Sequence, residues 1–460
     1  MKVLFLNHPT IGHLNPLLTI ALELRDRGHQ PHFFVPGIKG FDPRFNILRT
    51  ASAVPDTIAR HHLPVDVMLP PLAVLYKSLF VPFASGYKEF ALVADLFTKG
   101  TKYYTEKILK LIDRIKPDVL VSDFAFIPAH IAAEVANIPC VVVYHSGLPF
   151  RGRGIPPFAS GLSISGNHIE IGRHYEKMEN AILTRMDKRL NVIRRKFGLP
   201  IFPSKMLRVP YSKWLNLVTS VESMEAPRDN LTDNTFYIGP CFANRKGQSD
   251  NSGFPFDRLK ADAYKIYVSL GTVFNGKPKV FSKIMSAMEG TDCQVIVSAG
   301  GAYNSLIRHN VPRNTMLFPS VPQVDILPRM DLVIGHGGNN SIGETLAAGK
   351  PLIVLPVGGE QGDNASRIEY LKVGLRLDIK RFTVEEIRQT VERIRKDSTF
   401  SFRAKEIKAA IDRTDGPQTA SDCIEWLNHT KRPLHRPPGF PLTVTKDDMA
   451  ALTTSANLGH

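Results

Sequence analysis

Short apolar runs alternate with amphipathic segments through the first third of this chain. Residues 2–6 and 119–122 have the continuous apolar character of buried strands, whereas residues 14–27 and 104–116 show the apolar spacing of helices. Parallel strands need a long crossover connection, which a helix usually supplies. The alternation therefore predicts a parallel sheet with helices on both faces. The other elements predicted here are strands at residues 32–35 and 140–144 and a helix at residues 128–136.

The same alternation begins again in the second half of the chain. Residues 266–270 and 332–334 are predicted strands, and residues 280–288 are a predicted helix. The segment between the halves is polar and rich in Gly and Asn, which is typical of a linker. We therefore expect two α/β domains with a cleft between them. The predicted divisions are residues 1–238 for the first domain, 239–262 for the linker, 263–427 for the second domain and 428–460 for an extended tail.

Composition restricts the class of partner. The 58 Lys and Arg residues exceed the 43 Asp and Glu residues, so the formal net charge is +15. These basic residues are spread along the whole chain without a zinc-finger or RNA-binding motif, so we expect a solvated surface and no nucleic-acid partner. The four cysteines lack C-x-x-C spacing, which favours reduced thiols in a cytoplasmic protein over a metal site. A transmembrane helix is not expected, because no uncharged stretch reaches about 18 residues.

Two ionisable residues follow predicted strands in the first half. Ligands of open parallel sheets bind beyond the carboxyl ends of the strands. His13 stands beside Gly12 after the first strand, just before a predicted helix, and is expected to point into the cleft. Asp123 follows the strand at residues 119–122 and can orient an imidazole from another loop. The alternatives are a surface or capping histidine and a turn aspartate.

A glycine-rich turn is the strongest local signal in the second half. Residues 335–341 read GHGGNNS between a predicted strand and a predicted helix. Glycines let backbone N–H groups approach an anion, and the helix offers its N-terminal amides and dipole. His336, Asn340 and Ser341 can donate to a phosphate, and Glu344 can accept from sugar hydroxyls. This pattern predicts a nucleotide diphosphate site, with a capped tight turn as the alternative.

Two further loops carry polar candidates. Glu360 and Gln361 follow a predicted strand and suit hydrogen bonding to a polyol, although a solvated turn is also possible. Residues 271–277 satisfy G-x-x-x-x-G-K, but Pro278 stands where a P-loop needs Ser or Thr. We therefore expect Thr272 to contact phosphate without NTPase activity. The G-x-G-x-x-G fingerprint of dinucleotide enzymes is absent from the sequence.

Residues 321–365 resemble the donor-binding signature of the nucleotide-sugar glycosyltransferases of family 1. The Gly12-His13 loop and the SLGT sequence at residues 269–272 are similar to that family too, so the resemblance spans the chain to about residue 427. It implies an α/β GT-B fold, in which two Rossmann-like domains face each other. The acceptor would bind the N-terminal domain, and the nucleotide sugar would bind the C-terminal domain.

The resemblance also implies roles for the site residues. His13 would be the general base, supported by Asp123, and attack at the anomeric carbon would invert an α-linked sugar to a β-glycoside. Helix amides and His336 would stabilise the leaving diphosphate, so no metal or other cofactor is expected beside a UDP-sugar or TDP-sugar. The residues implied to bind the donor are Gly271, Thr272, Val321, Gln323, His336, Gly338, Asn339, Asn340, Ser341, Glu344, Glu360 and Gln361.

The sequence departs from the plant members of that family. Ser320 replaces a tryptophan expected to stack on uracil, so UDP over TDP is only a preference. Asn339 replaces the second plant tryptophan, as in bacterial members, which indicates a microbial natural-product enzyme. Glu360 stands where plant members have Asp, and glucose remains the expected sugar.

The acceptor is predicted less directly. Five aromatic residues can line an apolar cleft for a small lipophilic acceptor, although their near-helical spacing also suits a plain core. They are Phe80, Phe83, Tyr87, Phe90 and Phe150. The apolar segment at residues 62–97 also leaves peripheral membrane contact open. The alternative functions are a nucleotide-sugar epimerase or hydrolase, a non-catalytic nucleotide-sugar-binding protein and a P-loop NTPase.

Overall fold

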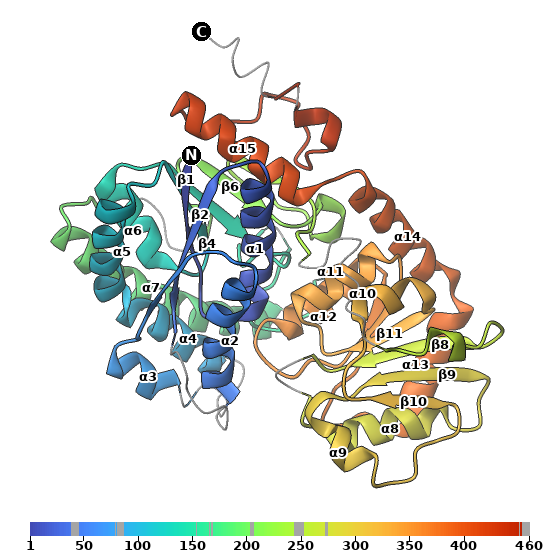
Figure 1. Cartoon of the computed structure of the whole chain (residues 1–460). Coiled ribbons are helices and arrows are strands. Elements are labelled where there is room, and N and C mark those ends of the chain that lie inside the picture. The colour runs from blue at the N-terminus through green and yellow to red at the C-terminus, as the bar shows by residue number, and fades with distance from the viewer. Residues whose placement is uncertain are drawn as a thin grey trace. The chain divides into compact units, whose positions relative to one another are not determined.

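The structure is a computed structural model (Figure 1). It describes residues 1–37, 46–78, 80, 87–152, 154–164, 166, 169–202, 207–242, 253–271, 275–449 and 451–452. The chain forms two compact units, which we call the first and the second unit. The first unit consists of Met1–Ser160, His168–Ala243 and Arg413–His460, and the second of Gly161–Asn167 and Asn244–Asp412.

The first unit contains a parallel sheet of seven strands among the described residues. Its strand order is β3-β2-β1-β4-β5-β6-β7, so β1 and β4 are neighbours at the centre. The order reverses at that pair, and such a reversal opens a crevice at the carboxyl ends of the strands. The strands are β1 Lys2–Leu6, β2 Gln30–Pro36, β3 Val65–Met68, β4 Val119–Asp123, β5 Cys140–Tyr144, β6 Leu215–Val218 and β7 Thr235–Tyr237.

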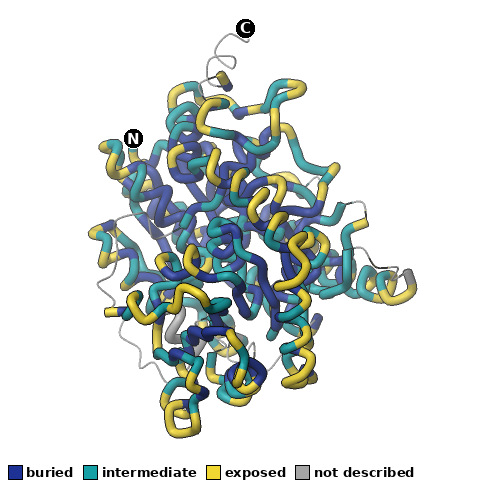
Figure 2. Tube along the Cα trace, turned by 90° about the vertical axis from the view of Figure 1, so that its right-hand side faces the viewer, coloured by how far each residue is buried: buried dark blue, intermediate teal, exposed yellow. Residues whose placement is uncertain are grey.

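Helices cover both faces of this sheet, as the strand–helix alternation predicts. Val3 and Phe5 pack in one core with helices α1 and α15, whereas Leu4 and Leu6 pack in another core with α5 and α6. Central strands buried on both faces account for the uninterrupted apolar runs in the sequence (Figure 2). The helices are α1 Ile11–Asp26, α2 Asn46–Arg60, α3 Leu72–Ser78, α4 Tyr87–Lys99, α5 Thr101–Ile115, α6 Ile127–Ala136, α7 Ile169–Lys196 and α15 Gly416–Thr430.

The last helix belongs with the first unit, which differs from the predicted second domain of residues 263–427. Leu427 is fully buried in the same core as α1, and Arg27 binds Asp422 at 2.6 Å. The tail also packs on this unit, because Val444 is buried and Thr443 bridges Tyr237. Apolar spacing predicts that residues 416–430 form a helix but does not identify the partner of that helix.

The second unit has a six-stranded parallel sheet among its described residues, in the order β10-β9-β8-β11-β12-β13. Its strands are β8 Tyr264–Ser269, β9 Cys293–Ser298, β10 Thr315–Phe318, β11 Leu332–Gly335, β12 Leu352–Val354 and β13 Gly374–Arg376. Its helices are α8 Pro278–Met288, α9 Tyr303–Leu306, α10 Gln323–Ile326, α11 Asn339–Ala347, α12 Gln361–Tyr370, α13 Val384–Lys396 and α14 Ser398–Asp412. Short 3-10 helices lie at Phe256–Arg258, Gly300–Ala302 and Leu327–Arg329 in this unit, and another lies at Glu222–Met224 in the first unit.

Two helices begin earlier than the sequence predicts, and both shifts affect the candidate site. Helix α1 begins at Ile11, so His13 lies in its first turn and not before it. Helix α11 begins at Asn339, so Ser341 also lies in a first helical turn. Pro16 lies inside α1. Because proline favours the first turn of a helix, Pro16 predicts a helix that begins closer to residue 16 than the observed start at Ile11.

Candidate active site

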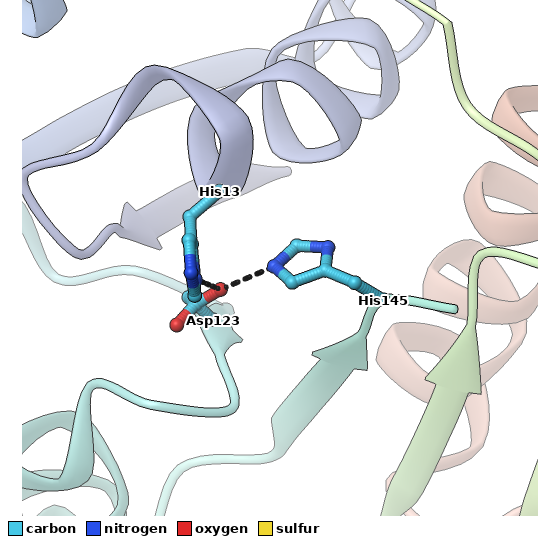
Figure 3. A group of neighbouring side chains, drawn as sticks. All are labelled: His13, Asp123 and His145. Atoms are coloured by element: carbon cyan, nitrogen blue, oxygen red, sulfur yellow. Dashed lines mark hydrogen bonds and ion pairs between the residues drawn. The ribbon is translucent and has the colours of Figure 1, made fainter. Parts of the chain in front are cut away.

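His13 and Asp123 lie in contact, as the sequence predicts. Asp123 is the last residue of β4 and is fully buried, and the side chain of His13 is 28% exposed. His13 Nδ1 lies 2.8 Å from Asp123 Oδ2 (Figure 3). Because β1 and β4 are adjacent parallel strands, the segments that follow them meet at one edge of the sheet. The contact pairs an imidazole with a carboxylate through Nδ1, so Nε2 is the ring atom of His13 that can meet a substrate.

A third residue, His145, completes this cluster and was not among the predicted site residues. It follows β5, and its Nε2 lies 2.8 Å from the same oxygen, Asp123 Oδ2 (Figure 3). The other oxygen of Asp123 accepts a hydrogen bond from the N–H of Ala125 at 2.8 Å. The signal was present in the sequence, because residues 140–144 were a predicted strand and His145 stands at its carboxyl end.

The hydrogen bonds determine the charge of Asp123. Burial alone would raise the pKa of this carboxyl, but His13 and His145 outweigh burial and lower the pKa below its usual range. An ionised carboxylate only accepts hydrogen bonds, so the ring nitrogens that face it carry protons. In its neutral form, His13 then presents an unprotonated Nε2, which is the form that a general base needs.

Aromatic rings enclose the pair. Phe124 stacks on His13 with 5.9 Å between ring centroids, and His8 lies 5.2 Å from His13. Burial, followed by the proximity of His13, lowers the pKa of His8 to about 3. His8 is therefore neutral near pH 7. Of the two imidazoles that contact Asp123, His13 is the more exposed, at 28% against 11% for His145.

The same three side chains also have the composition of a metal site. The candidate ligand atoms of His13, Asp123 and His145 lie within 4.8 Å of one another. Two imidazoles and a carboxylate can coordinate a transition metal. The hydrogen bonds to Asp123 already account for this arrangement, and the expectation that catalysis needs no metal stays a prediction.

In the second unit, the glycine-rich turn surrounds His336. The ring of His336 lies between two glycines, since a Cβ on Gly271 would come within 2.5 Å of it and one on Gly338 within 2.6 Å. Gly271 also has φ +73°, a left-handed backbone conformation. Burial lowers the pKa of His336 to about 4, so the ring is neutral and donates from one nitrogen. Its Nδ1 is buried and has no hydrogen-bond partner among the described residues.

The N-terminus of α11 lies beside this ring. Gly338 is the N-cap residue, and its backbone is extended with no side chain to cap the first amides. The N–H groups of the predicted residues Asn339, Asn340 and Ser341 therefore stand in the first turn, where intrahelical acceptors are lacking. This end of the helix attracts an anion.

A second part of the predicted donor site lies one turn further along α11. Gln323 donates through Nε2 to Glu344, and Tyr267 donates to the amide oxygen of Gln323 at 3.2 Å. Burial raises the pKa of Glu344 to about 7. Tyr267, Gln323 and Ser341 also line one pocket, and Val321 is buried nearby in the core that contains Tyr267. The structure thus brings Gln323 and Glu344, two of the predicted donor-binding residues, into contact.

Helix α12 supports the glycine-rich turn through residues that the sequence reasoning missed. Asn364 donates to the carbonyl of Gly337 at 2.9 Å, and Arg367 donates to Asn339 at 3.4 Å. Gln361 is buried, and its amide oxygen accepts the N–H of Val357 at 2.8 Å. Glu360, the N-cap residue of α12, is partly exposed beside it. The signal in the sequence for Asn364 and Arg367 was the polar helix that follows the GGEQ loop at residues 358–361.

Among the described residues predicted to line the acceptor cleft, Tyr87 and Phe90 lie in contact in one core, whereas Phe150 is buried in another. Phe80 is 47% exposed, whereas Tyr87, Phe90 and Phe150 are buried in hydrophobic cores, which fits the core alternative. Thr272 and Phe83 lie outside the described residues. Near Phe80, the side chain of Leu72 is 83% exposed, so this region does present apolar surface. In the part of the chain that the structure describes, no helix is both long and apolar enough to span a bilayer.

Comparison with known proteins identifies relatives of this chain. Residues 211–409 match the family described as UDP-glucoronosyl and UDP-glucosyl transferase. The chain is 24% identical to the NDP-glycosyltransferase YjiC of Bacillus subtilis over 91% of this chain and 95% of that protein. It is 25% identical to the demethyllactenocin mycarosyltransferase of Streptomyces fradiae over 91% of this chain and 85% of that protein.

Solved structures show the same architecture. The crystal structure of CalG4, the calicheamicin glycosyltransferase, matches with a TM-score of 0.71 and 20% identity over 93% of this chain and 98% of that chain. The spinosyn rhamnosyltransferase SpnG complexed with thymidine diphosphate matches with a TM-score of 0.63 and 17% identity, over 92% of this chain and all of that one. The two parallel-sheet units therefore have the GT-B fold, as the sequence predicts.

The matching family and the curated relatives define the class of this protein as a transferase enzyme. The chain is a glycosyltransferase, and its predicted resemblance to the UDP-glycosyltransferases is confirmed by the match over residues 211–409 and by these relatives.

Proposed function

We propose that this enzyme moves glucose from UDP-glucose to a hydroxyl of a small lipophilic natural product, with inversion at the anomeric carbon and with His13 as general base. The observation that carries the proposal is the 2.8 Å contact between His13 Nδ1 and the buried Asp123. It supports a base with a fixed tautomer, an ionised partner and an exposed edge.

The proposed reaction gives one set of residues a role at the acceptor and another set a role at the nucleotide-sugar donor. His13 Nε2 takes the proton of the acceptor hydroxyl while the acceptor oxygen attacks the anomeric carbon. The bond between that carbon and the diphosphate oxygen breaks, and the sugar inverts. Asp123 stabilises the imidazolium that forms on His13. The N-terminal amides of α11 and the buried His336 stabilise the leaving diphosphate, so the proposal needs no metal.

The donor assignment rests on the second unit. The first turn of α11 would hold the diphosphate, Glu344 the ribose, Gln323 the nucleobase, and Glu360 with Gln361 the sugar hydroxyls. UDP is preferred on the family match, although a relative of known structure binds thymidine diphosphate, which makes TDP-sugars the competing donors.

The proposed acceptor class rests on the relatives. The curated relatives include the 4'-demethylrebeccamycin synthase of Lentzea aerocolonigenes, which is 24% identical over 93% of this chain, besides the mycarosyltransferase. SpnG has been solved with the spinosyn aglycone. Both observations favour a microbial natural product over a macromolecular acceptor.

A donor screen by calorimetry in the presence of EDTA tests the proposal. The probes are UDP-glucose, UDP-GlcNAc, UDP-glucuronate, TDP-glucose and ATP, and selective binding of UDP-glucose is the expected result. Selective binding of TDP-glucose would correct the donor, and binding that requires a divalent metal would overturn metal independence. Release of UDP without any glycoside across an acceptor library would favour a hydrolase.

A further inference from the structure

Two imidazoles share one carboxylate oxygen in the first unit. His13 Nδ1 and His145 Nε2 each lie 2.8 Å from Asp123 Oδ2 (Figure 3). Asp123 Oδ1 accepts from the N–H of Ala125 at 2.8 Å. Three N–H donors therefore fix the orientation of Asp123, and His145 is the side chain among them that the proposed reaction does not use.

The sheet sets the position of His145. In the β4–β5 register, Asp123 pairs with Val143, and His145 lies two residues further along the chain. Its side chain is 11% exposed, and its ring meets the ring of His13 edge to face with 4.6 Å between centroids. Phe124 packs on both rings. His145 is thus held against Asp123 and His13 by packing as well as by the hydrogen bond.

The shared oxygen has an electrostatic consequence. A carboxylate beside an imidazole stabilises the protonated ring, and this effect weakens when another donor takes up part of the negative charge of the carboxylate. A base must be unprotonated when the acceptor arrives. If the N–H of His145 were removed, Asp123 would bind a protonated His13 more strongly, and less of the enzyme would hold an unprotonated base near neutral pH.

We infer that His145 is a positioning residue, which fixes Asp123 toward His13 and limits how strongly that carboxylate retains a proton on His13. The catalytic part of this inference rests on the proposed role of His13 as general base. Other ionisable groups lie around the cluster. Burial raises the pKa of Tyr144 and of Tyr211 well above the usual value of 10, so both stay neutral across the titration. Burial lowers the pKa of both His8 and His130 to about 3, so neither is charged above pH 5. Glu225 accepts the N–H of Gly147 at 2.8 Å.

The test is an NMR titration of the His13 ring between pH 5 and pH 9, followed at Cε1–H without substrate. His145→Phe keeps an aromatic ring but removes the donor, and His145→Gln restores an N–H donor that does not titrate. We expect the midpoint of His13 protonation to rise by about one pH unit in the Phe variant and to return to within about 0.3 of the wild-type value in the Gln variant. If His145→Phe does not fold, His145→Ala replaces it.

A matched control removes a different histidine from a different aspartate. His32 on β2 binds Asp66 at 2.6 Å, and His32→Gln should leave the His13 midpoint unchanged. An unchanged or lowered midpoint in the Phe variant overturns the inference, as does a Gln variant that behaves like the Phe variant. Failure of the proposed function is distinguishable, because it would appear as full turnover by His13→Ala, whatever the titration shows.

Discussion

A single carboxylate, Asp123, determines the chemistry of the two histidines around it. It is fully buried, and its depressed pKa keeps it ionised near neutral pH despite that burial. Asp123→Asn keeps the shape but removes the charge that would stabilise a protonated His13. We expect kcat to fall by about 10²–10⁴-fold. Because Asp123 is not part of the donor site, the Kd for UDP should stay within about twofold. A kcat within threefold of wild type would contradict the role of Asp123.

Glu344 is a residue whose burial opposes its ionisation. Its pKa of about 7 exceeds the ordinary value of 4.5, so the folded protein binds more protons than the unfolded chain between those pH values. The free energy of unfolding should therefore decrease as pH rises from about 4.5 to about 7. Glu344→Gln should remove this decrease, which amounts to at most about 3 kcal/mol. Urea unfolding at pH 5 and pH 8 measures it, and equal pH dependence in both proteins would contradict the burial of this charge.

At the scale of elements, the N-terminus of α11 depends on the glycines around His336. The backbone at Gly338 would accept an alanine because its φ is −68°, but the added Cβ would come within 2.6 Å of the His336 ring. Gly338→Ala should therefore displace the ring and raise the Kd for UDP by about tenfold or more. Gly172→Ala is the control, since nothing lies within 4 Å of that Cβ position. Equal affinity in both variants, measured by calorimetry, would remove His336 from the proposed diphosphate site.

Local patterns predicted the elements well, and contacts between distant segments less well. The strand at residues 140–144 has the predicted bounds, because its β-branched run ends where a turn begins. The contact of His13 with Asp123 was also predicted, because adjacent parallel strands place their carboxyl ends together. His145 was missed, since a histidine after a short strand has no local feature that identifies Asp123 as its partner.

At the scale of the whole molecule, residues distant in sequence belong to one unit. Leu427 of α15 is fully buried in the core of the first unit, so Leu427→Ala should destabilise that unit by about 2–4 kcal/mol. Hydrogen exchange followed by mass spectrometry should show faster exchange in peptides from residues 1–160, and UDP should protect peptides from residues 253–412. Faster exchange confined to the second unit would contradict the assignment of α15. Sequence spacing could not reveal this assignment, because it contains no information about partners almost 400 residues away.

The most direct test of the proposed function is glycoside formation by wild type and His13→Ala with UDP-glucose, EDTA and a library of lipophilic acceptors. Wild type should form a β-glycoside, and His13→Ala should lose about 10³-fold or more in kcat with an unchanged Kd for UDP. The intact donor affinity would show that the variant is folded. Turnover by His13→Ala within tenfold of wild type, on the same acceptor, would show that His13 is not the general base.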